Sequence, residues 1–301
     1  IFEKQLHADA TAAERFLADL LSEGRISDSA VPPRLAAAMR HAVLGGGKRF
    51  RPFVVMASAR LFAAPPRPAI AAAAAVELIH CYSLVHDDLP AMDNDLLRRG
   101  QPTVWSAFDD WTAILAGDAL QSLAFEVLSA PDLELDGSRQ AALIHCLARG
   151  AGPAGMVAGQ QLDLDVGRRG EPADPSLAFV ERMQSLKTGA LLACAAECGA
   201  ILGNADPSAT QALCRYGHAI GQAFQIADDL LDVEGSEAET GKAVSKDSEA
   251  GKATFIGLLG TDGARQSLVR LKAEALGALA GFGENADALR GAVEFIASRR
   301  S

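Results

Sequence analysis

Two aspartate clusters are the groups of this chain best suited to bind metal ions. They read D-D-L-P-A-M-D at residues 87–93 and D-D-L-L-D at residues 228–232. Each follows an apolar stretch, where adjacent carboxylates repel one another and lose hydration unless a cation compensates them. Carboxylate oxygens suit Mg²⁺, which fills its remaining positions with water and substrate phosphate. Two such clusters therefore predict a shared site for magnesium and a polyphosphate.

Helix geometry treats the two clusters differently. Asp228 and Asp232 are four residues apart and share one helix face, which Gln225 joins. Asp87 and Asp93 are six residues apart, about 240° around an ideal helix. The proline between them disturbs the local turn. The helix must therefore end or bend if these two are to act together, and the alternative for any single cluster is a solvated helix end.

Basic residues occur near the first cluster and before it. The run G-G-K-R-F-R-P at residues 46–52 supplies Lys48 and Arg51, and Arg98 and Arg99 follow the first cluster. Glycines let a backbone approach an anion closely, arginine offers phosphate a planar fork, and lysine acts as a point charge. Either group alone is a weak signal, because basic surface turns are common. Together with two acidic clusters they predict a phosphate ligand.

Two further polar side chains interrupt apolar helical stretches. His80 precedes Asp87 by two helical turns, so we expect it on the same face, pointing into the acidic cleft. The alternative is that His80 is a core residue whose hydrogen bonds are made within the protein. Lys187 lies inside the helical run 179–200, where it either faces a charged ligand or extends to water.

Residues 235–251 differ in amino-acid composition from the rest of the chain. They contain Gly, Ser, Glu, Thr and Lys with few apolar anchors, and Lys242, Lys246 and Lys252 fall in or beside them. An inert surface connection is the ordinary interpretation of such a stretch. Three lysines so close to an acidic cluster favour a mobile lid that meets phosphate instead.

Net charge and composition exclude some partners. The 301 residues carry a formal charge of −10, which disfavours binding to nucleic acid. The five cysteines include no C-x-x-C pair, and we interpret them as buried reduced thiols of a cytoplasmic protein. Cys194 and Cys198 share a helix face, but no His or further Cys is spaced to complete a zinc site. Apolar runs shorter than about 18 residues predict no stable membrane insertion.

The hydrophobic pattern predicts an all-α protein. Helical periodicity recurs along the chain, while alternating β-branched and aromatic runs are nearly absent. Gly- and Pro-rich breakers separate long segments, of which 103–130 and 138–166 are expected to be helices inside a bundle. No repeat, linker or shift in composition divides the chain, so residues 1–301 are expected to form a single domain.

At these residues the chain resembles the trans-isoprenyl diphosphate synthases, in particular the bacterial farnesyl diphosphate synthase branch. The similarity runs over about residues 34–299, in the family's order. Beyond the motifs above it includes L-R-R-G at 97–100, A-G-D-A-L at 116–120, G-Q-Q-L-D at 159–163, K-T-G at 187–189 and F-Q-I-A-D-D at 224–229. Leu96 and Gln101 depart from the family's usual Asp and Lys, and neither is an implied metal ligand.

The resemblance implies a single-domain bundle of long helices around a central cavity, and a magnesium-dependent prenyltransferase. It would join isopentenyl diphosphate head to tail to dimethylallyl or geranyl diphosphate, with three Mg²⁺ ions per site and Mn²⁺ as an alternative. It also implies a homodimer. The implied metal ligands are Asp87, Asp93 and Asp228, supported by Asp88 and Asp232. The implied groups on the allylic diphosphate and cation are Arg98, Lys187, Thr188, Gln225, Lys242 and Lys252. The implied groups on isopentenyl diphosphate are Lys48, Arg51, His80 and Arg99.

Product length is implied by the residues just before the first cluster. Helix geometry places Ser83 directly below Asp87, at i−4. In farnesyl-producing members of the family an aromatic residue at the fifth position before the motif is the usual floor, so the resemblance points to Tyr82. Farnesyl diphosphate is therefore the expected product, with geranyl or geranylgeranyl diphosphate as alternatives. A terpene cyclase fits the second cluster less well, and a non-catalytic helical subunit remains the alternative from another class.

Overall fold

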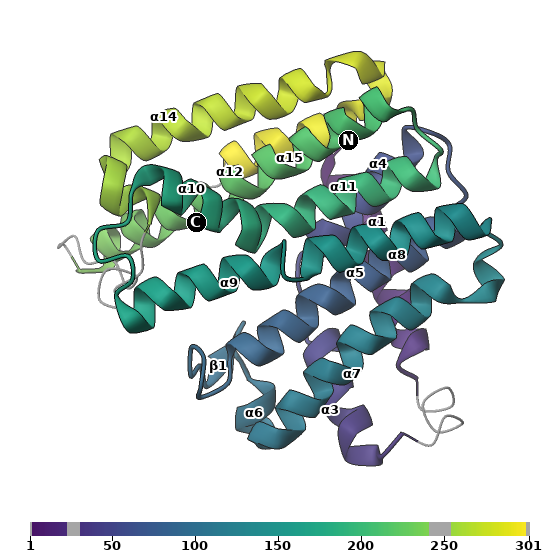
Figure 1. Ribbon diagram of the computed structural model, residues 1–301, viewed down its shortest axis with the longest axis horizontal. Coiled ribbons are helices and arrows are strands. Elements are labelled where there is room, and N and C mark those ends of the chain that lie inside the picture. The colour runs from purple at the N-terminus through teal and green to yellow at the C-terminus, as the bar shows by residue number, and fades with distance from the viewer. Residues whose placement is uncertain (1, 23–30, 241–253, 299–301) are drawn as a thin grey trace. The chain divides into compact units, whose positions relative to one another are not determined.

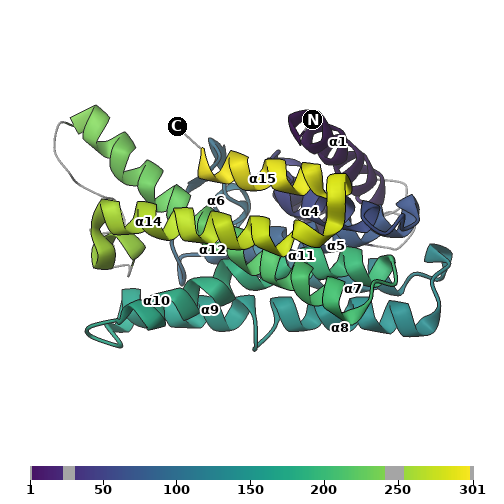
Figure 2. The same ribbon diagram turned by 90° about the horizontal axis from the view of Figure 1, so that it is seen from above.

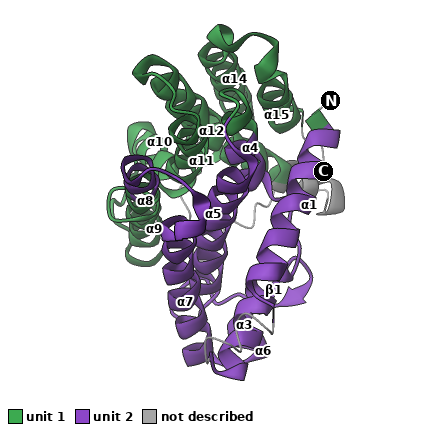
Figure 3. Ribbon diagram, turned by 90° about the vertical axis from the view of Figure 1, so that its right-hand side faces the viewer, with its two compact units in different colours: residues 1–2, 57–63, 145–301 green, residues 3–56, 64–144 purple. Residues whose placement is uncertain are grey.

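The computed structural model describes residues 2–22, 31–240 and 254–298, apart from the side chains of Asp232 and residues 234–240. These residues are helices joined by loops, with one short hairpin (Figure 1). They form two compact units: unit 1 contains residues 1–2, 57–63 and 145–301, and unit 2 contains residues 3–56 and 64–144 (Figure 3). The all-α prediction is confirmed. The single-domain interpretation stays a prediction.

Unit 2 is built around two apolar helices that lie side by side, α5 and α7 (Figure 1). Its elements are α1 (Phe2–Leu20), α3 (Pro33–Leu44), α4 (Phe50–Arg60), α5 (Pro66–Asp87), β1 (Leu97–Arg98), β2 (Gln101–Pro102), α6 (Val104–Ala107), α7 (Asp110–Ser129), η1 (Pro131–Leu133) and the start of α8 (Gly137–Ala151). The strands β1 and β2 pair antiparallel, with Leu97 opposite Pro102.

The sequence of α5 explains its central place in unit 2. A run of alanines from Ala71 to Ala75 is fully buried, because small side chains let neighbouring helices approach on every side of it. Pro66 and Pro68 begin the helix, where the missing N–H costs no hydrogen bond. The Asp109 carboxylate caps the next long helix, α7, by accepting a hydrogen bond of 2.7 Å from the Thr112 backbone N–H.

A buried ion pair fixes the turn between α3 and α4. Arg49 Nη1 lies 2.7 Å from Glu77 Oε1, and the two side chains are 1% and 4% exposed. Arg49 also donates to the Val43 carbonyl at 2.6 Å and to the exposed Glu14 at 3.4 Å. Arg49 itself has φ of 48°, in the left-handed region. These contacts hold the residues that precede and follow Arg49 in one conformation.

We expect Glu77→Leu to lower the free energy of unfolding by about 3–5 kcal/mol, because it leaves the Arg49 guanidinium buried without its counter-ion. The double variant Arg49→Met, Glu77→Leu should recover most of that loss. Glu14→Ala, which removes the exposed partner, is the matched control and should cost less than about 1 kcal/mol. Urea denaturation measures all three, and a Glu77→Leu protein as stable as the wild type would contradict the expectation.

Unit 1 contains the other long helices (Figure 2). Its elements after α8 are α9 (Met156–Leu164), η2 (Asp165–Arg169), α10 (Leu177–Gln184), η3 (Ser185–Gly189), α11 (Ala190–Leu202), α12 (Pro207–Thr240), α14 (Phe255–Ala278), η4 (Ala280–Ala286) and α15 (Asp287–Ala297). Helix α12 packs against both α11 and α14. Its Tyr216 is fully buried, and the hydroxyl donates to the Leu289 carbonyl at 3.0 Å, which attaches α15 to this core.

Two segments predicted as single long helices are broken in the structure. Residues 103–130 divide into α6 and α7, because Asp109 is extended, with φ of −179°, and starts a new helix with its own cap. Residues 138–166 divide into α8 and α9 with Gly152 and Pro153 between them. A proline cannot continue the hydrogen-bond pattern of a helix. Those two predictions were therefore wrong about length, although both segments are helical.

Two helical stretches are long and apolar enough to cross a membrane, judged by length and composition alone. They are Pro66–Asp87 and the continuous run Leu177–Leu202. Of their most apolar windows, 78% and 61% is buried inside the protein. Buried helices of a protein core pass the same test, so the two are weak grounds for a membrane protein. The absence of stable membrane insertion stays a prediction.

Candidate active site

The first aspartate cluster folds back on the end of α5. The helix ends at Asp87, and the backbone N–H of Asp93 donates to the Asp87 carbonyl at 2.8 Å. The backbone N–H of Asp95 donates in the same way to the Asp88 carbonyl, at 3.1 Å. Pro90 and the left-handed Asn94 lie in the turn that makes this possible. The predicted helix end is confirmed, and it brings Asp93 beside Asp87 despite a spacing that an unbroken helix would not allow.

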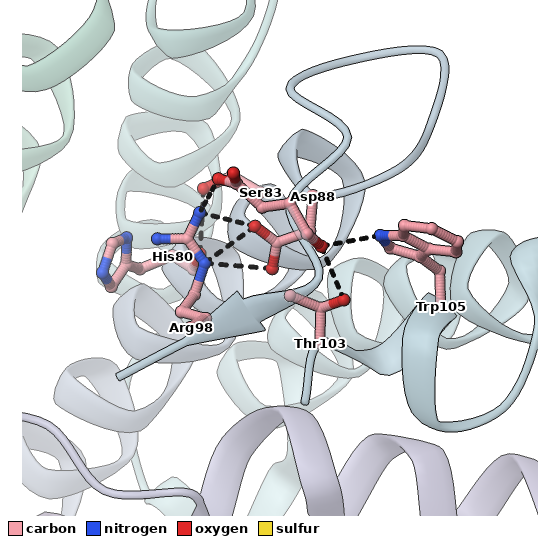
Figure 4. A network of polar contacts seen from close by, with 7 residues as sticks. His80, Ser83, Asp88, Arg98, Thr103 and Trp105 are labelled. Atoms are coloured by element: carbon pink, nitrogen blue, oxygen red, sulfur yellow. Dashed lines mark hydrogen bonds and ion pairs between the residues drawn. The ribbon is translucent and has the colours of Figure 1, made fainter. Parts of the chain in front are cut away.

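Asp88 is bound by Arg98 rather than open to a ligand. Arg98 Nε donates to both Asp88 carboxylate oxygens, at 2.9 and 3.0 Å, and Nη2 lies 2.5 Å from Oδ1 (Figure 4). Burial raises the pKa of Asp88 above its ordinary value, although Arg98 offsets part of that rise. The forked contact is the strong geometry for arginine and carboxylate. Arg98, which was expected on phosphate, thus has Asp88 as its partner here.

The hairpin that carries Arg98 is tied to the same turn. The Asp95 carbonyl accepts hydrogen bonds of 2.8 Å from the Thr103 hydroxyl and from the Trp105 indole N–H (Figure 4). The Thr103 backbone N–H donates to the Leu96 carbonyl at 3.0 Å. These bonds close the loop that follows the first cluster. The side chains of Thr103 and Trp105, more than ten residues after Asp87, therefore fix the position of this loop.

The glycine turn at residues 45–47 lies against Arg99. The Arg99 guanidinium donates to the Gly46 carbonyl, and a Cβ on Gly47 would be 2.4 Å from Arg99 Nη1. Gly47 has φ of 143°, which an L residue rarely adopts. Lys48 is exposed and Arg51 is half-buried beside this turn. A small pocket of about 60 Å³ is lined in part by Gly45, Gly46, Asp88, Arg98 and Arg99.

His80 has arginines among its charged neighbours. Burial lowers the pKa of its imidazole well below the ordinary value, and the charges of Arg51 and Arg99 lower it further. The side chain is half-buried on α5, near Arg98 (Figure 4). That His80 points into the acidic cleft stays a prediction. A neutral imidazole can still donate one hydrogen bond to an anion.

Tyr82 packs toward α7. Its side chain is 6% exposed and meets the His86 ring edge-on, with ring centroids 5.8 Å apart. The His86 ring in turn contacts Gly117 of α7. Burial raises the pKa of Tyr82, and Gln121 lies near enough to offset part of the rise. Among the described residues, the hydroxyl nevertheless has no partner within hydrogen-bond geometry. Ser83 bonds its own helix instead, donating to the His80 carbonyl at 2.8 Å.

The second cluster belongs to a chain of polar side chains in unit 1. Gln225 Nε2 donates to Asp229 Oδ1 at 2.8 Å, and the Thr188 hydroxyl donates to Gln225 Oε1 at 3.5 Å. Gln225 was expected to join Asp228 and Asp232, but its partner is Asp229 at i+4. Asp228 is half-buried on α12. Asp87 and Asp93 belong to unit 2, whereas Asp228 belongs to unit 1.

Lys187 lies in η3, a π-helical turn between α10 and α11. Its ammonium is 2.5 Å from Asp163 Oδ2 on α9, and the two side chains are 26% and 10% exposed. Such local widening of a helix is frequent at functional sites. On α12, a Cβ on Gly221 would be 2.5 Å from Gly189 Cα, so the two backbones touch here. That close approach places Gln225, one turn further along α12, beside Thr188.

Some predicted site residues lie outside the described part of the chain. Lys242, Lys246 and Lys252 fall within residues 241–253, and the side chain of Asp232 is likewise not described. Helix α12 continues to Thr240, so the first six residues of the loop expected at 235–251 are helical.

Two residues of the site stand in motifs quoted from the sequence but were given no role there. Asp163 pairs with Lys187, and Asp229 accepts from Gln225. Asp229 is 5% exposed, and its place next to Asp228 in an apolar helix was a usable signal. The partner of Lys187 comes from another helix, α9, and no spacing along the chain connects the two.

The chain is similar to known prenyl synthases along nearly its whole length. The family model described as polyprenyl synthetase matches residues 32–279. A farnesyl diphosphate synthase of Haemophilus influenzae is 45% identical over 303 residues, covering 100% of this chain and 99% of that protein. A farnesyl diphosphate synthase of Escherichia coli is 42% identical over 288 residues, covering 91% and 94%.

A solved structure shares the fold. It is described as an FPP/GFPP synthase from Zymomonas mobilis, in its apo form. The two chains superpose with a TM-score of 0.86 and 42% identity, over 98% of each. At that identity and coverage, the likeness extends to sequence as well as to architecture.

Proposed function

Because this chain belongs to the polyprenyl synthetase family and is a prenyltransferase, we propose that it makes farnesyl diphosphate by condensing isopentenyl diphosphate with dimethylallyl and then geranyl diphosphate. Its relatives in Haemophilus influenzae and Escherichia coli carry that activity in their names. The observation that carries the proposal for this site is the turn that brings Asp93 back to Asp87 at the end of α5. It gathers carboxylates beside an apolar helix, as diphosphate chemistry with a metal requires.

Members of this family are generally Mg²⁺-dependent, and the donor set here fits that ion. Asp87, Asp93 and Asp228 supply hard carboxylate oxygens, whereas Asp88 is held by Arg98 and has a supporting role. We propose three Mg²⁺ ions per site, with Mn²⁺ as an alternative and Asp232 as an additional ligand. When bound, the ions neutralise negative charge on the leaving diphosphate.

Residues of unit 1 would act on the allylic substrate. Lys187 would bind the diphosphate with its ammonium, which Asp163 holds in position. As the C–O bond breaks, positive charge develops on the allylic carbon, and the oxygens of Thr188 and Gln225 are suited to stabilise it. The apolar walls exclude water that would trap the cation.

Residues of unit 2 would bind isopentenyl diphosphate. Lys48, Arg51 and Arg99 supply positive charge, and a neutral His80 supplies one hydrogen-bond donor. The double bond of this substrate attacks the allylic cation, and the released diphosphate accepts the final proton. The reaction needs no nucleophilic side chain, in agreement with a site made of carboxylates and cations.

Three finer points belong to the same proposal. Lys242 and Lys252 would contact the allylic diphosphate, and Arg98 would support it from β1 while it holds Asp88. The enzyme would work in the cytoplasm, without stable membrane insertion and without nucleic acid. It would be a homodimer.

We expect Gly47→Ala to raise KM for isopentenyl diphosphate by about tenfold more than Gly46→Ala does, or ~1.4 kcal/mol of lost binding. Both positions have positive φ, so both variants strain the backbone, but only a Cβ at Gly47 meets the Arg99 guanidinium. Steady-state kinetics on the two purified variants make the comparison. Equal KM values for the two variants would show that the contact between Arg99 and Gly47 does not contribute to the binding of isopentenyl diphosphate.

The proposed activity is tested by diphosphate release from isopentenyl plus dimethylallyl diphosphate. Release should require both substrates and should stop when EDTA removes divalent ions, then return with added Mg²⁺. A protein that releases no diphosphate under any of these conditions would fit a non-catalytic helical subunit and would overturn the proposal.

A further inference from the structure

Three cysteines from two helices meet inside unit 1. Cys146 of α8 lies with its Sγ 3.5 Å from Cys194 Sγ of α11, and Cys194 Sγ is 4.0 Å from Cys198 Sγ. All three sulfur atoms lie within 4.8 Å of one another. The side chains are 6%, 3% and 0% exposed. The sequence offered only the pair Cys194 and Cys198, and the fold supplies the third thiol from a residue 48 positions earlier.

Helix packing explains why these thiols meet. Cys146 and Gly150 are four residues apart on α8 and share one face. Gly150 sits directly on Cys194, since a Cβ there would be 2.8 Å from Cys194 Cβ and 3.4 Å from its Sγ. Because Gly150 has no side chain, α8 can approach α11 closely. Cys146, one turn before Gly150 on α8, therefore lies in contact with Cys194. On α11, Cys194 and Cys198 are one turn apart and face the same way.

The three thiols perturb one another. Contacts with Cys146 and Cys194 lower the pKa of the Cys198 thiol, whereas contacts with Cys146 and Cys198, together with burial, raise the pKa of Cys194 well above its ordinary value. Soft sulfur ligands gathered this closely between two apolar helices suit a thiophilic cation.

We propose that Cys146, Cys194 and Cys198 bind one thiophilic cation of the Cu(I) class through three sulfur atoms. A cation bonded to three sulfurs in a plane at about 2.3 Å would require sulfur separations of about 4 Å, close to those present. Soft thiolate ligands select Cu(I), Zn²⁺ or iron–sulfur clusters. Structural zinc takes four ligands, whereas this group of described residues offers three, and Cu(I) is satisfied by three. Each thiol that binds the cation as a thiolate releases its proton to solvent.

The nearby acidic residue does not complete a zinc site in this arrangement. Glu197 is half-buried on α11. Burial raises the pKa of its carboxyl group, and the contact with Cys146 raises it further. Its carboxylate is not among the atoms that lie within 4.8 Å of one another. Cys146 follows the exposed His145 on α8.

The test is an anaerobic titration of the reduced, full-length protein with Cu(I) delivered as its bicinchoninate complex. We expect one Cu(I) per chain, and X-ray absorption should show three sulfur neighbours at about 2.3 Å. Cys146→Ala and Cys198→Ala should each lower the affinity at least a hundredfold. Cys81→Ala is the matched control, since Cys81 is an equally buried thiol outside the cluster, and it should leave Cu(I) binding unchanged.

Two outcomes would overturn the proposal. One is Cu(I) uptake by Cys198→Ala that equals uptake by the wild type. The other is a wild-type protein that takes up one Zn²⁺ with four ligands and does not take up Cu(I). The sulfur count is measured on the wild type, so it decides the question even if a variant fails to fold, and circular dichroism of each variant identifies that case.

Discussion

Asp87→Ala and Asp228→Ala are each expected to lower turnover by at least ~10²-fold, because each removes a carboxylate proposed to hold the metal that neutralises the leaving group. The fold should survive, since Asp87 is the last residue of α5 and Asp228 is half-buried. Turnover is measured at saturating Mg²⁺ and substrate, so that a weakened ion affinity is not mistaken for a lost chemical step.

A matched control for these variants is Asp132→Ala. Asp132 pairs with Arg67 on the surface of unit 2, and both side chains are more than half exposed. Such pairs contribute at most about 1 kcal/mol, so turnover and stability should remain near wild type. Activity within tenfold of wild type for both Asp87→Ala and Asp228→Ala would contradict the metal-site assignment.

Tyr82→Ala is expected to shift the product from fifteen carbons to twenty or more. The growing chain must extend away from the diphosphate, and Tyr82 is proposed to block its path. The side chain is buried near α7, so its removal leaves space rather than exposing a surface. Products are separated by chain length after phosphatase treatment, and the rate of the first condensation should be largely kept.

Tyr82→Phe is the control that this structure suggests. The Tyr82 hydroxyl has no partner within hydrogen-bond geometry in the part of the chain that the structure describes, so its removal should change neither product nor stability. The alanine variant must first be shown to fold, because truncating a buried aromatic residue typically costs about 3–5 kcal/mol. An unchanged product distribution in a folded, active Tyr82→Ala protein would remove Tyr82 from the chain-length role.

Local pattern was sufficient to predict the helices and the end of α5. Pro90 within the first cluster indicated that the helix must stop or bend, and the structure has α5 ending at Asp87. The break at Pro153 was readable in the same way, because residues 150–155 read G-A-G-P-A-G, whereas the hydrophobic pattern did not show the break at Asp109. Where helices are buried on every side, periodicity carries little information about their ends.

Partners from other elements could not be predicted. Arg98 was assigned to phosphate, yet its fork lies on Asp88, and Lys187 pairs with Asp163 from α9. His80 was placed by its register with Asp87, but its electrostatic neighbours are Arg51 and Arg99. Spacing along a helix determines which face a residue shares, whereas the element packed against that face depends on the tertiary fold. For the same reason, the sequence did not predict that Cys146 of α8 contacts the cysteine pair on α11.

The product of the unmodified enzyme tests the central claim most directly. The purified protein is incubated with dimethylallyl diphosphate, excess isopentenyl diphosphate and Mg²⁺, and the alcohols released by phosphatase are separated by chain length. We predict farnesol as the main product, with geraniol only as a transient intermediate at early times. Geranylgeraniol as the main product, or geraniol that is never extended, would contradict the assignment to farnesyl diphosphate synthesis.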